Sequence, residues 1–139
     1  MVRRKILLAD DDGDDRLIFT QVFDQLGRTN AALDVVENGL EVIDFLNRIH
    51  EDSALPNLII LDHNMPKMNG KQALHYLKSS QRYKSITVII YSTYNDTPFM
   101  EECEKLGASS IIAKPNSYEE YIEMVKFFLD VEVASPVAG

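Results

Sequence analysis

The residues of this chain that could do chemistry each follow an apolar run that predicts a buried strand. They are Asp10 and Asp11, Asp62, Ser92, and Lys114. Because the carboxyl ends of parallel strands open onto one crevice, we expect these side chains to converge there. Three carboxylates in one cleft repel one another unless a cation lies among them. A hard divalent ion is the natural solution, and Mg2+ fits best because it retains waters that a phosphate group can replace.

The cation, the Lys114 ammonium and the Ser92 hydroxyl would together define a site for a tetrahedral anion beside Asp62. Aspartate is a nucleophile for phosphoryl groups, and phosphoryl transfer mainly requires charge neutralisation and positioning. The chemistry that this arrangement predicts is an aspartyl phosphate. Asp62 by itself, with turn-forming residues after it, could equally be a solvated turn aspartate, so the prediction depends on the other strand ends.

The elements that must position these residues alternate along the chain. Apolar, β-branched segments predict five strands, at residues 5–9, 33–37, 58–62, 86–91 and 110–113. Helical periodicity predicts helices after Gly13, Asn38, Gly70, Thr97 and Ser117. This alternation predicts a doubly wound (βα)5 three-layer α/β sandwich with a flavodoxin-like parallel sheet of order 2-1-3-4-5. The polar segment from His50 to Asn57 is expected to be a loop.

Capping residues define the expected helix ends. Asn38 with Glu41, and Ser117 with Glu120, match the reciprocal capping box. Thr97 is expected to cap the fourth helix, because a proline follows it at the first helical position. The inner stripe expected for the last helix is Tyr118, Tyr121, Ile122, Val125, Phe128 and Leu129.

Composition limits the classes of protein to consider. The 139 residues suit one domain, expected at 1–131, with a flexible tail at 132–139. A net charge of −8 argues against direct nucleic-acid or anionic-membrane binding. No stretch has transmembrane length, and the single cysteine, Cys103, excludes an internal disulfide, so the expected location is the cytoplasm.

Four motifs at these strand ends resemble the receiver domain of two-component response regulators. They are Asp10-Asp11, the block from Asp62 to Gly70 that reads DHNMPKMNG, Ser92, and Lys114-Pro115. The resemblance covers about residues 5 to 130. It implies a signalling protein that is not an enzyme beyond its own phosphorylation and dephosphorylation.

The resemblance also implies a role for each residue of the site. Asp62 would be the phosphoacceptor, and Asp11, Asp62 and the main-chain carbonyl of Asn64 would bind Mg2+ directly. Asp10 would act on the metal through water. The residues expected to contact the phosphoryl group are Ser92, Thr93 and Lys114. The implied Lys114-Pro115 peptide bond is cis.

One position departs from the family pattern. The family usually has an aromatic switch residue three positions before the lysine, where this chain has Ile111. Isoleucine cannot make the same swing, so signalling is expected to use the loop after Ser92 and the helix beginning at Pro98. The chain resembles single-domain receivers, and its long loop before the third strand is similar to the subset that works with phytochrome-type kinases.

The resemblance implies partners as well. The phosphoryl donor would be a sensor histidine kinase or a histidine phosphotransfer protein. The downstream protein would bind the face formed by the fourth helix, fifth strand and fifth helix. That face is rich in glutamates, so we expect a monomer, or a homodimer through an apolar patch such as Phe127-Phe128-Leu129. His63 is expected to have a surface role, and Asp12 to be solvated.

Two other functions fit parts of the pattern. A phosphatase of the haloacid dehalogenase type also uses an aspartate after a strand, but it needs a second aspartate two residues later, where this chain has Asn64. An unphosphorylated interaction module with a relic pocket is the third reading. It is disfavoured because every residue that phosphorylation needs is present.

Overall fold

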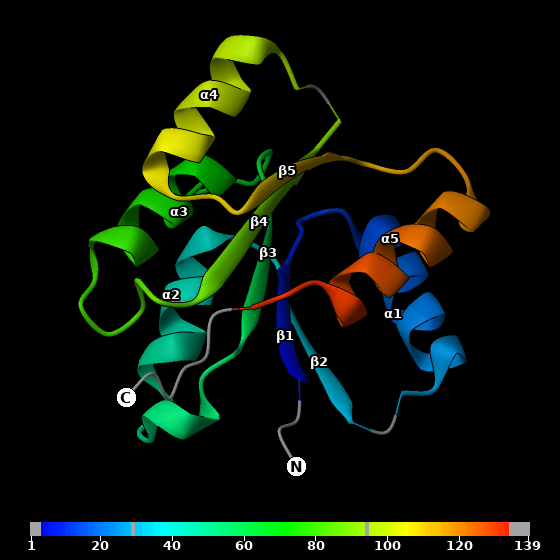
Figure 1. Ribbon diagram of the computed structural model, residues 1–139, viewed down its shortest axis with the longest axis horizontal. Coiled ribbons are helices and arrows are strands. Elements are labelled where there is room, and N and C mark those ends of the chain that lie inside the picture. The colour runs from blue at the N-terminus through cyan, green and yellow to red at the C-terminus, as the bar shows by residue number, and fades with distance from the viewer. Residues whose placement is uncertain (1–3, 29, 94, 134–139) are drawn as a thin grey trace.

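The computed structural model describes residues 4–28, 30–93 and 95–133. One parallel sheet lies between two layers of helices (Figure 1). The strands are β1 (Arg4–Ala9), β2 (Ala31–Val36), β3 (Leu58–Asp62), β4 (Thr87–Ser92) and β5 (Ser110–Ala113). The helices are α1 (Gly13–Leu26), α2 (Gly39–Asn47), α3 (Gly70–Ser79), α4 (Thr97–Leu106) and α5 (Tyr118–Asp130), with a short 3-10 turn, η1 (Asp52–Ala54).

The strand order is β2-β1-β3-β4-β5, with every neighbouring pair parallel. The register places Ala9 beside Leu61, Asp62 beside Tyr91, and Ser92 beside Ala113. These pairs bring the ends of four strands to one edge. The expected fold class and strand order are confirmed.

Each face of the sheet has its own core. Strand residues alternate between the faces, so Leu7 packs toward α2, α3 and α4, whereas Leu8 packs toward α1 and α5. The first core includes Val42, Leu46, Leu74, Leu77 and Cys103, and the second includes Phe19, Val22, Tyr121, Val125 and Phe128. Figure 1 shows α1 and α5 together on one side of the sheet. The central strands are thus covered on both sides, as their continuous apolar sequences indicate.

Several element ends differ from expectation. Strand β2 lies at 31–36, earlier than the expected 33–37, and the expected 50–57 loop contains η1. Asp96, not Thr97, caps α4, because its carboxylate accepts a hydrogen bond from Phe99 N at 2.8 Å. Thr97 is the first helical residue. Aspartate and threonine both cap helices well, so the sequence alone could not decide between them.

The other caps form with a small change. Asn38 and Ser117 accept hydrogen bonds from the main-chain nitrogens three residues on, as expected. The carboxylates of Glu41 and Glu120, however, accept from the residue before the cap and not from the cap itself. In α5 the expected stripe is wrong at Tyr118, which is 44% exposed, and it lacks Met124, which is buried.

Residues 134–139 of the expected tail lie outside the described residues. Among the helices that are described, none is long and apolar enough to cross a bilayer. Cys103 is a free, buried thiol in the core beneath α4, which agrees with a packing role.

Candidate functional site

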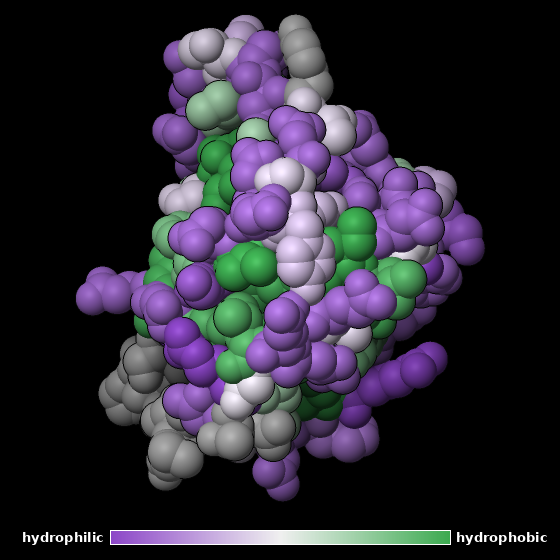
Figure 2. Space-filling model, turned by 90° about the vertical axis from the view of Figure 1, so that its right-hand side faces the viewer, coloured by the Kyte–Doolittle hydropathy of each residue, from purple (hydrophilic) through white to green (hydrophobic). Residues whose placement is uncertain are grey.

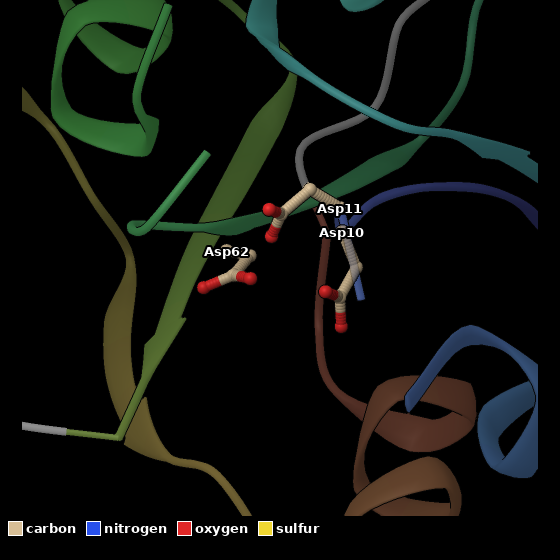
Figure 3. A group of neighbouring side chains, drawn as sticks. All are labelled: Asp10, Asp11 and Asp62. Atoms are coloured by element: carbon tan, nitrogen blue, oxygen red, sulfur yellow. The ribbon is translucent and has the colours of Figure 1, made fainter. Parts of the chain in front are cut away.

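Strand ends supply the acidic centre of the site. Asp10 directly follows β1, and Asp62 is the last residue of β3. Both are buried, while Asp11 is exposed beside them. One carboxylate oxygen from each of the three residues lies within 4.8 Å of the other two (Figure 3). The predicted convergence of these carboxylates is therefore present in the structure.

Main-chain amides and a tyrosine fix two of these carboxylates. Asp10 accepts hydrogen bonds from Asp12 N at Oδ1, at 3.0 Å, and from the Tyr91 hydroxyl at Oδ2. Asp62 Oδ1 accepts from Asn64 N at 3.1 Å. Buried carboxylates need such partners, because water no longer solvates them.

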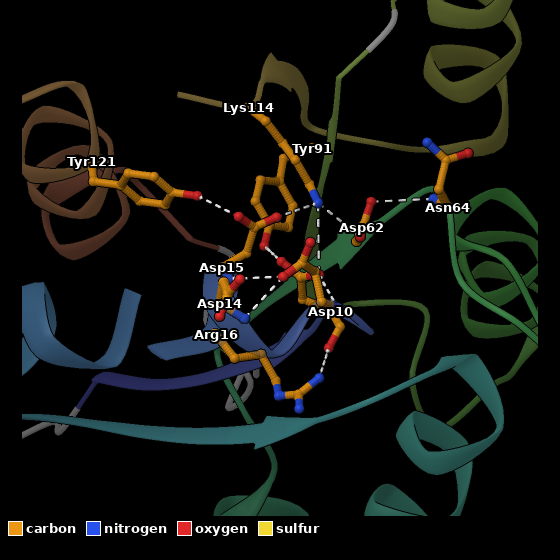
Figure 4. Close-up of polar contacts among 10 residues, drawn as sticks. Asp10, Asp14, Asp15, Arg16, Asp62, Asn64, Tyr91, Lys114 and Tyr121 are labelled. Carbon is orange, nitrogen blue, oxygen red and sulfur yellow. Dashed lines mark hydrogen bonds and ion pairs between the residues drawn. The ribbon is translucent and has the colours of Figure 1, made fainter. Parts of the chain in front are cut away.

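Lys114 directly follows β5, and its side chain extends into the acidic site. Its Nζ donates to Asp62 Oδ2 and to Asp15 Oδ2, both at 2.9 Å, and lies 3.6 Å from Asp10 Oδ1 (Figure 4). It also lies 5.0 Å from the centre of the Tyr91 ring, within range of a cation–π interaction. Lys114 N donates to Ser92 O at 3.0 Å, which joins the ends of β4 and β5.

Burial controls the electrostatics of the centre. It raises the pKa of Asp62 from 3.8 to about 7, and the neighbouring Asp10 adds to this rise while Lys114 opposes it. Burial lowers the pKa of Lys114, but its hydrogen bonds to Asp15 and Asp62 outweigh that effect and raise the pKa overall. Burial, with the charge of Asp10, also raises the pKa of Tyr91, so this hydroxyl is a hydrogen-bond donor at neutral pH.

The donor set fits a hard divalent cation. Three carboxylates with oxygens within 4.8 Å of one another offer the ligands that Mg2+ prefers. Burial, with the neighbouring Asp10, keeps the pKa of Asp62 high even though the Lys114 ammonium lowers it. A divalent cation among them would favour the ionised form of Asp62.

The loop between β3 and α3 packs directly against the main chain of Asp62 and His63. A methyl group at Gly70 would lie 2.6 Å from Asp62 O and 2.9 Å from His63 Cα, too close for any other residue without movement of the loop. Gly70 N donates to His63 O, and Asn69 forms a capping box with Gln72 at the start of α3. The glycine of the DHNMPKMNG block is therefore required for this close approach.

The remaining predicted residues lie around the same edge. Ser92 is buried, whereas Thr93 and Asn64 are exposed. Ile111 in β5 is partly buried and packs against the core on the α4 side. The peptide bond between Lys114 and Pro115 is trans, contrary to the implied cis form.

His63 does not have the surface role that was expected. Its ring packs on Phe99 of α4, with the ring centres 4.5 Å apart, and its Nδ1 is buried with no hydrogen-bond partner among the described residues. Burial, with the nearby Lys71, lowers its pKa. The residue after Asp62 is thus in contact with the first turn of α4.

Sequence reasoning missed four contributors to the site. Asp12 caps α1, and Tyr91 holds Asp10. Asp15 holds Lys114, and the Tyr121 hydroxyl donates to Asp15 Oδ1 at 3.1 Å. Strand alternation could have suggested Tyr91, since it precedes Ser92 on β4 and points to the opposite face. No local pattern indicates the Asp15–Tyr121 pair, because it depends on how α1 packs against α5.

Comparisons with known proteins agree with this fold. The response regulator receiver domain family matches residues 6–126. Sporulation initiation phosphotransferase F of Bacillus subtilis is 30% identical over 132 residues, covering 95% of this chain and 98% of that protein. Response regulator Rcp1 of Synechocystis sp. is 27% identical over 123 residues, covering 87% of this chain and 83% of Rcp1.

A solved structure extends the likeness to three dimensions. The phosphorylated cyanobacterial phytochrome response regulator RcpA has a TM-score of 0.83 and 26% identity, covering 96% of this chain and 99% of RcpA. The sheet order, the acidic cluster at the strand ends and the family match over most of the sequence lead to one assignment. The chain belongs to the response regulator receiver domain family.

Proposed function

We propose that this protein accepts a phosphoryl group on Asp62 from a sensor histidine kinase or a histidine phosphotransfer protein, with Mg2+ as cofactor. The observation that carries the proposal is the buried Asp62 carboxylate, which lies among two acids and the Lys114 ammonium at the end of β3. The assignment of the chain to the receiver domains of two-component systems rests on the family match.

Each residue of the site would have its own role in phosphoryl transfer. In transfer from phosphohistidine, an Asp62 oxygen forms a bond to phosphorus as the nitrogen–phosphorus bond breaks, and the released imidazole takes a proton from water. Lys114, already 2.9 Å from Asp62 Oδ2, pairs with the charge of the transferred group. The Ser92 hydroxyl donates to a phosphoryl oxygen, with Thr93 next to it in the same segment.

Mg2+ would be held directly by Asp11, Asp62 and the main-chain carbonyl of Asn64, and through water by Asp10. When bound, it supplies neutralisation of the charge on the transferring group. Both carboxylate oxygens of Asp10 accept hydrogen bonds, from Asp12 N and from the Tyr91 hydroxyl, and these contacts hold Asp10 beside the proposed metal site.

Turnover of external phosphoesters is disfavoured. The haloacid-dehalogenase mechanism needs an acid two residues after the nucleophile, and an amide at Asn64 cannot protonate a leaving group. We therefore assign a signalling role in which the protein catalyses only its own phosphorylation and dephosphorylation.

The signal would reach a downstream protein through the α4-β5-α5 face. Six glutamates on α4 and α5 are exposed, which favours a partner with basic residues: Glu101, Glu102, Glu104, Glu119, Glu120 and Glu123. Kinases of the phytochrome type are the favoured donors, since RcpA is described as a phytochrome response regulator. A reducing cytoplasm is the favoured compartment, in keeping with a free buried cysteine.

The test is to incubate the protein with acetyl phosphate and to measure its intact mass by mass spectrometry. We expect the mass of one phosphoryl group to be added in the presence of Mg2+ and not in the presence of EDTA. Asp62→Asn should abolish the addition, while Asp34→Asn, an equal charge change on the exposed side of β2, should not. Phosphorylation that persists in Asp62→Asn would refute the assignment of the phosphoacceptor.

A further inference from the structure

We propose that Asp15, held by Tyr121, is a positioning residue for Lys114 in phosphoryl transfer. This inference rests on the proposed function of Asp62. It assigns a role in the site to a residue of α1 and a residue of α5, neither of which lies at a strand end.

The ammonium of Lys114 lies between two carboxylates from different elements. It donates to Asp62 on one side and to Asp15 on the other, at 2.9 Å in each case. Lysine is a point charge on a flexible four-carbon stem, so a single contact fixes its position poorly. The second carboxylate gives Lys114 a defined position before any phosphoryl group arrives, and preorganisation of this kind lowers the barrier to transfer.

Asp15 is itself fixed at both oxygens. Its Oδ2 accepts from Lys114, and its Oδ1 accepts from the Tyr121 hydroxyl at 3.1 Å (Figure 4). Tyr121 is 5% exposed and belongs to the core between α5 and the sheet, so its ring cannot move freely. Burial, with the charge of Asp15, raises the pKa of Tyr121, which keeps the hydroxyl protonated as a donor.

An acid in the first turn of a helix could be explained by the helix dipole alone. Asp14 offers a comparison, because it lies in the same turn and is exposed. Among the described residues its carboxylate makes no hydrogen bond or ion pair, whereas that of Asp15 makes both. The dipole accounts for Asp14 but not for the orientation of Asp15 toward Lys114.

The experiment compares Asp15→Asn, Tyr121→Phe, their double variant and the control Asp14→Asn. Tyr121→Phe removes one hydroxyl and leaves all charges in place. Initial rates of phosphorylation by acetyl phosphate, Mg2+ affinity, and the 15N chemical shift of the Lys114 ammonium are measured for each. Circular dichroism melts check that each variant is folded.

We expect Asp15→Asn to lower the phosphorylation rate about fivefold to tenfold, and Tyr121→Phe about threefold, from the usual net worth of an intramolecular hydrogen bond. Both should shift the Lys114 resonance. Tyr121→Phe should leave Mg2+ affinity within about twofold, because it changes no charge and Tyr121 is not a proposed metal ligand. The double variant should be no worse than Asp15→Asn alone. Asp14→Asn should match the wild type.

A rate that is unchanged or higher in Asp15→Asn overturns the proposal, since Asp15 would then be neutral or would compete with Asp62 for Lys114. Additive effects in the double variant overturn the part assigned to Tyr121. If the wild type is not phosphorylated at all, the function proposed for Asp62 fails. The Lys114 resonance of the resting protein then decides separately whether Asp15 and Tyr121 position the ammonium.

Discussion

Asp62 is held in surroundings that favour its protonated form when no metal is bound. Its pKa rises from 3.8 to about 7 on folding, mainly through burial. The native state therefore keeps this proton to a higher pH than the unfolded chain does. By linkage, the contribution of Asp62 to stability is highest below about pH 4 and declines until about pH 7.

This linkage gives a prediction for Asp62→Asn. In EDTA, the wild type should lose on the order of 2 kcal/mol relative to Asp62→Asn between about pH 4 and pH 7, because the amide does not ionise. Urea unfolding of both proteins across that range measures the difference. Parallel stability profiles would show that folding does not change the pKa of Asp62. Added Mg2+ should restore wild-type stability at neutral pH, since the cation binds the ionised form.

For individual residues, the sequence predicts which side chains meet when they stand at the ends of parallel strands. Asp10, Asp62 and Lys114 meet because parallel strands end at one edge, and this requires no knowledge of side-chain packing. Asp15 and Tyr121 could not be predicted in the same way. Their contact joins helices that are far apart in the sequence, and it depends on the relative rotation of those helices.

Among the elements, we expect the segment from β4 to α4 to carry the signal. Ile111 and Phe99 both pack against the core under α4, but Ile111 has no ring to turn inward. His63, next to the proposed phosphoacceptor Asp62, contacts Phe99. The first turn of α4 thus touches both the residue after Asp62 and the core around Ile111.

We therefore expect phosphorylation to move the segment from Ser92 to Phe99 without a large change at Ile111. Structures of the free and beryllofluoride-bound protein measure both movements. Phe99→Leu keeps an apolar side chain but removes the ring contact with His63, and it should weaken the response of α4 while leaving phosphorylation intact. A large change in the Ile111 rotamer with a stationary Ser92–Phe99 segment would contradict this view.

The helix ends show where prediction by element is limited. Where the sequence offers a single residue with a strong capping preference, as at Asn38 and Ser117, the expected cap forms. At α4 the sequence offers Asp96 and Thr97 in succession, and the backbone selects Asp96 because its side chain reaches Phe99 N. Pattern alone leaves such a boundary uncertain by one residue.

The arrangement of the molecule follows from the alternation of strands and helices, and the sequence predicts its fold class and strand order. The apolar patch expected at the end of α5 is smaller than its sequence suggests. Phe128 and Leu129 are buried in the core, and only Phe127 is exposed, at 41%. Figure 2 shows the side of the molecule that carries α1 and α5, where apolar atoms lie among polar ones. The exposed large apolar residues of these two helices are Leu17, Tyr118 and Phe127.

This surface leads to a prediction about assembly. A dimer through the α4-β5-α5 face would bring like charges together, at a cost that salt screens. We expect the protein to be monomeric, or to form a dimer through the apolar residues of α1 and α5 that salt does not dissociate. Sedimentation of phosphorylated and unphosphorylated protein at low and high salt tests this, with Phe127→Ser as the variant. A dimer that dissociates as salt is raised would show that charge pairing holds it.

The two tyrosines of the site give the protein an optical property of its own. The chain has no tryptophan and six tyrosines, so its near-ultraviolet emission comes from phenol rings. Tyr91 and Tyr121 each donate to a carboxylate of the site, on Asp10 and Asp15 respectively. The emission of a phenol depends on whether its hydroxyl is bonded to a carboxylate. The intrinsic tyrosine fluorescence of the unlabelled protein should therefore change when a ligand binds the acidic cluster.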